Sequence, residues 1–205
     1  MVKSREAQNR GGERPPCAPL PPGYNRIVGR ARPAILYQYY ALIHFRTCER
    51  CLARHGEIFT DPALAPPLHE GCRCSYLEFP AEEQSYYREK AERMRQRAKQ
   101  ELERRALFRQ GKELLHSSPE AAIPLLQRAA EIEVFLEEVE ELCRDCTGLL
   151  AHPELAKQLR DIFIYGYQDK FTREKYAHVP EGMRWALESF GVQRIKELFH
   201  DLIPH

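Results

Sequence analysis

Residues 48–74 read CERCLARHGEIFTDPALAPPLHEGCRC, and this stretch groups cysteine and histidine more densely than any other part of the 205-residue chain. Its pattern is Cys-x2-Cys, then seventeen residues, then His-x2-Cys-x-Cys. A Cys-x2-Cys knuckle lets two thiolates reach one Zn²⁺ at about 2.3 Å, and further donors brought back by a turn complete a tetrahedron. The stretch therefore predicts a small irregular zinc-binding module.

Five candidate ligands compete for four positions: Cys48, Cys51, His69, Cys72 and Cys74. The first two cysteines are the clearest pair, and the remaining three residues supply the other two ligands. Four protein ligands leave no open position for water, so the metal is expected to be structural. Other readings stay open: disulfide bonds, unconnected thiols, or three ligands and a metal-bound hydroxide near His55 or Asp61.

Prolines and charges divide the chain into three parts. Residues 1–33 are a Pro/Arg-rich arm with little to bury, which we expect to be flexible. Residues 34–80 are the metal-binding module, and the apolar run 33–45 at its start fits a strand or a short buried helix. Residues 81–205 are expected to form an all-α domain. The predicted fold class is mainly α, an irregular zinc-binding module followed by a C-terminal helical bundle.

Apolar periodicity predicts the helices of the third part. We expect helices over about 82–112, 119–149, 153–163, 180–191 and 192–202. The first of them carries a narrow apolar stripe on a very polar helix, namely Tyr87, Ala91, Met94, Ala98 and Leu102. Ser118 and Pro119 are a start signal for the second, whereas Pro124 is expected to kink it.

The near-zero net charge, +1, hides a separation of charges. The arm and the helix over 88–112 are basic, whereas the block 131–141 is acidic. We expect this block to dock on the basic helix. The arm, and with it the basic helix, is a candidate for salt-dependent contact with nucleic acid. The sequence shows no membrane span and no secretory signal, so no membrane partner and a cytoplasmic location are expected.

The module resembles a known family. Residues 47–59, TCERCLARHGEIF, and 66–74, PPLHEGCRC, are similar to the C-terminal signature of phage head-morphogenesis proteins, the Mu F-like minor capsid family. That signature has a Thr-Cys pair, a second cysteine, a glycine step to a phenylalanine and a closing Pro-Pro-x-His-x-x-Cys-Arg-Cys. The match covers residues 37–77. The resemblance implies a minor head component near the portal, or a prophage-derived relative, and thus a virion-associated location.

The sequence favours a non-enzymatic, zinc-stabilised interaction protein whose helical domain contacts a protein partner. Two alternatives are a metal-dependent nuclease or toxin-type hydrolase built on the same module, and a helical adaptor. The adaptor reading arises because residues 108–130 resemble a single tetratricopeptide unit. Outside the module, Cys143 and Cys146 are expected to be core thiols, and Cys17 lies alone in the arm.

Overall fold

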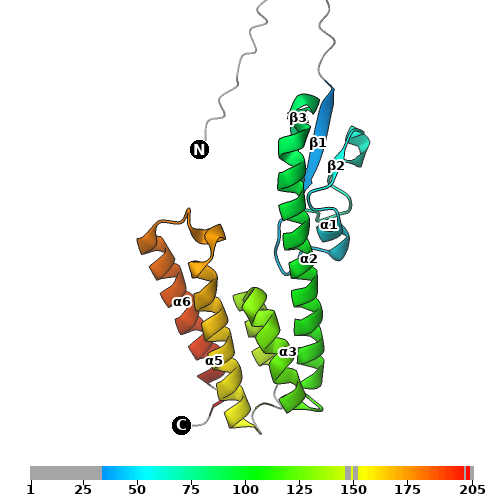
Figure 1. Ribbon diagram of the computed structural model, residues 1–205. Coiled ribbons are helices and arrows are strands. Elements are labelled where there is room, and N and C mark those ends of the chain that lie inside the picture. The colour runs from blue at the N-terminus through cyan, green and yellow to red at the C-terminus, as the bar shows by residue number, and fades with distance from the viewer. Residues whose placement is uncertain (1–33, 146–148, 150–151, 201, 204–205) are drawn as a thin grey trace, which may run out of the picture. The chain divides into compact units, whose positions relative to one another are not determined.

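The computed structural model describes residues 34–145, 149, 152–200 and 202–203; the predicted arm lies outside them. The unit Ala34–His205 is mainly helical and begins with a small sheet and the Cys/His region, in agreement with the predicted fold class. Figure 1 shows the sheet at one end of the long helix α2 and helix α3 beside the other end. No helix among the described residues is long and apolar enough to cross a lipid bilayer.

The sheet is antiparallel, with strand order β2-β1-β3. β1 (Ile35–Tyr40) lies in the centre, flanked by β2 (Ile58–Phe59) and β3 (Ser75–Pro80). For the run 33–45 the sequence allowed a strand or a short buried helix, and the structure has a strand. Aromatic and β-branched residues favour this choice. A short helix, α1 (Glu49–Ala53), connects β1 to β2.

Helix α2 (Gln84–Leu114) confirms the predicted apolar stripe. Ala91, Met94 and Ala98 are buried, and Tyr87 stacks on Phe79 of β3 with ring centroids 4.0 Å apart. The module approaches α2 closely at Gly56, whose φ is +82°. A Cβ at this position would lie 2.6 Å from the carbonyl oxygen of Ala91, so only glycine fits.

The predicted helix over 119–149 is wrong as a single element. It is divided into α3 (Pro119–Ile132) and α4 (Leu136–Asp145), with an extended backbone at Glu133. Val134, which follows the break, is 3% exposed and packs in the helical core. Pro124 lies inside α3 without ending it, and Ser118 is the N-cap residue but its side chain makes no capping hydrogen bond.

Two further helix boundaries differ from the prediction. α5 (Pro153–Asp169) continues six residues beyond the predicted end at 163, and α6 (Glu181–His200) is one helix where two were expected. Gly191, predicted to end a helix, lies inside α6, and both Gly166 and Gly191 are sites of close packing. A Cβ on Gly166 would lie 2.7 Å from the Ala130 carbonyl oxygen, and one on Gly191 would overlap the Tyr167 ring.

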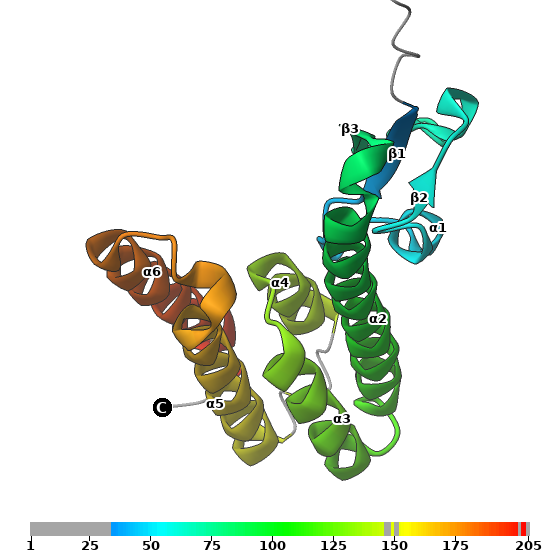
Figure 2. The same cartoon turned by 45° about the horizontal axis from the view of Figure 1, so that its top comes forward.

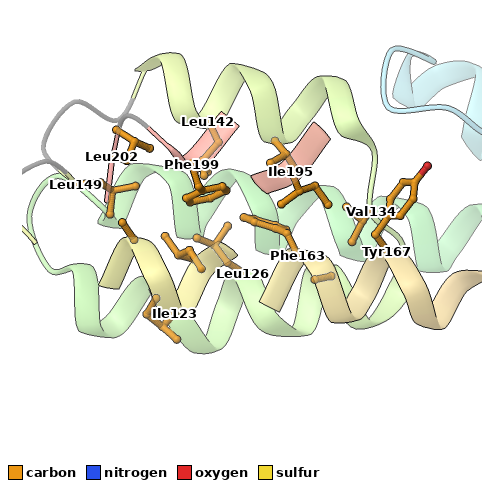
Figure 3. Close-up of a cluster of buried hydrophobic side chains, with 14 of the residues drawn as sticks. Ile123, Leu126, Val134, Leu142, Leu149, Phe163, Tyr167, Ile195, Phe199 and Leu202 are labelled. Atoms are coloured by element: carbon orange, nitrogen blue, oxygen red, sulfur yellow. The ribbon is translucent and has the colours of Figure 1, made fainter. Parts of the chain in front are cut away.

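The helical core lies between α3, α4, α5 and α6. Figure 3 shows its centre, where Phe163 of α5 meets Ile195 and Phe199 of α6 and Leu142 of α4. All four side chains are at most 1% exposed. A second, smaller core lies in the module and includes Tyr39, Leu52 and Phe59, with Ala98 of α2 packed against them. Helix α2 therefore borders on both cores.

A buried ion network joins α2 to α4. The Arg104 guanidinium, 1% exposed, donates two hydrogen bonds to Glu101 at 2.7 and 2.9 Å and two to Glu138 at 2.6 and 3.1 Å. Figure 2 shows α4 facing α2. The predicted docking of the acidic block on the basic helix is confirmed at this contact, while Glu140 of the same block pairs with Arg144 and Arg194 instead.

Candidate metal centre

The first two donors lie at the N-terminus of α1. Cys48 is its N-cap residue, and its sulfur accepts a hydrogen bond from the backbone N–H of Cys51 at 3.4 Å. Cys51 lies in the first turn and is 1% exposed. The knuckle spacing in the sequence is thus a helix start that points both sulfurs the same way.

The other donors come from the turn before β3. The backbone N–H of Cys72 donates to the carbonyl oxygen of His69 at 3.1 Å, and Gly71 adopts the left-handed φ of +73° that closes this turn. The Nδ1 of His69 lies 2.8 Å from the carbonyl oxygen of Glu70. A proton on Nδ1 leaves Nε2 available to a metal, the arrangement common for metal-bound histidines.

All five predicted ligands converge. His69 Nε2 lies 3.2 Å from the sulfur of Cys48 and 3.1 Å from that of Cys51, and the Cys51 and Cys72 sulfurs are 3.7 Å apart. The donors form two groups of three, Cys48, Cys51 and His69 on one side and Cys51, Cys72 and Cys74 on the other. Cys51 belongs to both groups, so it is the centre of a cluster that can hold a metal ion.

The thiols differ in electrostatic environment. Burial raises the pKa of Cys51 to about 12. Desolvation also opposes ionisation of Cys72, but hydrogen bonds from the backbone at Leu68 and Cys74 outweigh it and lower its pKa to about 6. The pKa of Cys48 is lowered in the same way, by Cys51 and His69. Adjacent thiolates repel each other, so a bound cation would allow the buried thiol to ionise as well.

Helix α2 holds the loop that precedes the knuckle. The Arg105 guanidinium donates to the carbonyl oxygens of His44 and Thr47, and its Nε donates to Glu101 at 2.7 Å. These carbonyls lie just before Cys48, so Arg105 positions the first ligand. Nothing in the sequence marks this role, because Arg105 is one of ten basic residues between 81 and 112.

His55 and Asp61 have structural roles. Asp61 accepts the backbone N–H of Ala63 at 2.8 Å and caps a short 3-10 turn. His55 is 6% exposed, and its Nδ1 accepts the backbone N–H of Ala41 at 3.0 Å. Burial, with a contribution from the positive charge of Arg97, lowers the pKa of His55 to about 4. The histidine is therefore neutral at pH 7 and fixes the end of β1.

The low pKa of His55 predicts a pH dependence of stability. In the unfolded chain its pKa is near 6.5, so between pH 6.5 and 4 the unfolded state binds a proton that the folded state excludes. Acidification across this window should cost roughly 2–3 kcal/mol of unfolding free energy. Denaturant titrations at several pH values measure this loss as the difference between the wild type and His55→Asn. Asparagine keeps a hydrogen-bond acceptor but does not titrate. Parallel pH profiles for the two proteins would contradict the assignment.

The remaining cysteines do not join the cluster in the described part of the chain. Cys143 packs on the helical core, as predicted, while Cys146 and Cys17 lie outside the described residues. The four cysteines of the module, Cys48, Cys51, Cys72 and Cys74, are free thiols, so the structure gives no support to a disulfide among them. No family model, curated protein or solved structure matches this chain.

Proposed function

We propose that the Cys/His cluster binds one structural Zn²⁺ and that the protein is a non-enzymatic, zinc-stabilised interaction protein. The observation that carries the proposal is the position of Cys51, whose buried sulfur lies 3.1 Å from His69 Nε2 and 3.7 Å from the Cys72 sulfur. Around a tetrahedral zinc ion, neighbouring sulfurs are about 3.8 Å apart and a sulfur and a nitrogen about 3.5 Å. The donors need only small shifts to reach these values.

Zinc suits the donors better than other common ions. Thiolate and imidazole select zinc among the abundant divalent cations, whereas magnesium and calcium take oxygen ligands. With four of the five donors bound, the ion has no open position for water, and its contribution is to folding. The structural roles of His55 and Asp61 count against either residue as the general base of the hydrolase alternative.

Metal analysis tests the zinc proposal. Purified protein should contain one equivalent of zinc, and at least three of the four module thiols should react with a thiol reagent only after chelation. Cys143 serves as an internal reference, since its reactivity should not depend on the metal. If no stoichiometric metal is found and the module thiols react freely in the native protein, the proposal fails.

The sequence resemblance supports a more specific role, that of a phage minor head component or a prophage-derived relative. The supporting residues are those of the knuckle and the closing Cys-Arg-Cys, within residues 37–77. In this chain the helical region follows the signature, starting at α2. The same module would then stabilise the attachment point of a helical partner-binding region, in the virion or in the cytoplasm.

Helix α6 supports the assignment of the partner surface to the helical region. Met183, Leu187 and Phe190 recur at helical spacing and are 57%, 44% and 66% exposed. Such a stripe matches the seam that one helix offers to another, so the proposed occupant is an amphipathic helix of a partner protein. The adaptor alternative rests on the helix pair α2–α3, which is in contact at Gly111.

The exposed stripe on α6 predicts unequal effects of one substitution at two positions. Leu187→Glu should leave the melting temperature almost unchanged, whereas Ile195→Glu, at a fully buried position of the same helix, should prevent folding. Thermal unfolding followed by circular dichroism measures both. Strong destabilisation by Leu187→Glu would show that the chain itself covers the stripe and would remove this support for a partner surface.

A further inference from the structure

A cleft of about 910 Å³ lies beside the module, away from the α6 stripe. Its walls are the end of β1, the exposed face of α2, Arg73 from the Cys-Arg-Cys segment, and the turn between α5 and α6. Its volume is within the range of roughly 300–1,000 Å³ typical of ligand sites. The proposed zinc site accounts for none of its charged residues.

The charge of the cleft is strongly positive. Arg73, Lys90, Arg93 and Arg97 line it, and Glu174 is the carboxylate among the lining residues. Among the described residues, Arg73 and Arg97 form no ion pair, and the pair of Arg93 with Glu89 at 2.9 Å lies at the surface with both side chains more than half exposed. Such a surface pair contributes little, so these guanidinium groups are available to an anion.

The spacing of the cations fits a chain of phosphates. Lys90, Arg93 and Arg97 follow one face of α2 at steps of three and four residues and span about 10 Å along the helix axis. A single phosphate would be held by donors that converge on one point, whereas a row of cations suits a linear polyanion. Because the chain's net charge is only +1, this row is a local feature.

Two tyrosines add aromatic surface to the same cleft. The Tyr86 ring is 62% exposed, and its edge-on contact with Tyr87, 5.1 Å between centroids, holds it in place. The Tyr40 ring is covered on one side by the ammonium group of Lys90 at 5.3 Å. Exposed aromatic rings beside a row of cations are the combination that binds single-stranded nucleic acid, since every base offers a face for stacking.

We propose that this cleft binds single-stranded nucleic acid, with the phosphates along Lys90, Arg93 and Arg97 and a base stacked on Tyr86. The proposal does not depend on zinc, because these four residues belong to α2. It also differs from contact through the N-terminal arm, since the binding residues lie within the folded unit.

Fluorescence anisotropy of the full chain with a labelled oligothymidylate of about 12 nucleotides tests the proposal. Each lost phosphate contact lowers the slope of log K against log salt by about 0.7 for single strands. Arg93→Gln with Arg97→Gln should therefore lower the slope by about 1.4 and weaken binding about 25-fold at roughly 0.1 M salt. Tyr86→Ala should weaken binding at least about fivefold with an unchanged slope.

Two control variants match the cleft variants in charge and residue type. One changes two cations of the same helix, and the other changes an exposed tyrosine on another helix. Arg88→Gln with Lys99→Gln removes the same charge from α2 outside the cleft, and Tyr165→Ala, at 72% exposure, removes a tyrosine from α5. Both should bind like the wild type. Equal losses in the cleft and control variants, or no binding at all, would overturn the proposal, as would thymidine monophosphate competing as strongly as the oligonucleotide.

Discussion

Replacing Arg104 by alanine will lower the free energy of unfolding by about 3–5 kcal/mol. The guanidinium is 1% exposed and makes paired hydrogen bonds to the carboxylates of Glu101 and Glu138. Removing it leaves Glu138, 8% exposed, as a buried carboxylate without its counter-ion. It also removes the guanidinium from the ring of Phe135, 4.8 Å away, which lies at the break between α3 and α4. Urea denaturation at neutral pH measures the loss.

A surface arginine of the same helix provides the control for Arg104. Arg109 pairs with Glu49 at 3.2 Å, but both side chains are about two-thirds exposed. Solvent screens this pair, so Arg109→Ala should cost no more than about 1 kcal/mol. Arg104→Lys should restore only part of the loss, because an ammonium group lacks the fork that binds two carboxylates. Equal costs for Arg104→Ala and Arg109→Ala would contradict a structural role for the buried network.

Cys51→Ser is expected to abolish stoichiometric metal binding and to cost at least about 4 kcal/mol where free zinc exceeds its dissociation constant about a thousandfold. Cys51 is the donor common to both groups of three, so its loss leaves neither group complete. Because metal binding in small modules is largely folding free energy, the loss should appear as a lower melting temperature in zinc-containing buffer.

Cys143→Ala is the matched control for Cys51→Ser. Cys143 packs on the helical core and is not among the cluster donors, so the variant should retain one equivalent of metal and lose about 1 kcal/mol. A Cys51→Ser protein with wild-type metal content and stability would show that the cluster does not depend on its central donor, and the zinc proposal would fail with it.

The ligand cluster was predictable because metal coordination is a local constraint. Ligands that share one ion must recur at short spacings, and the spacing from Cys48 to Cys74 identified all five donors before their positions were known. The residues that support the cluster leave no such mark. Arg105 reaches the carbonyl of Thr47 across 58 positions of sequence, and no spacing rule links them.

The sequence predicted which residues are helical better than it predicted where each helix begins and ends. The stripe on α2 was correct because Ala91, Met94 and Ala98 are all buried along one uninterrupted helix. The break at Glu133 and the continuity of α6 through Gly191 were not predictable, because both depend on tertiary contacts. A glycine that ends one helix and a glycine that admits the Tyr167 ring look identical in a sequence.

The length of α2 has a consequence for how the chain can be divided. Its 31 residues extend for about 46 Å, and its apolar stripe packs on the module while Gly111 packs on α3. Composition changes sharply at residue 80, but a fragment that ended there would lack Ala91 and Ala98, which pack against the module. A fragment meant to isolate the metal centre must carry at least the first half of α2, so the useful unit for dissection is a sheet with its supporting helix.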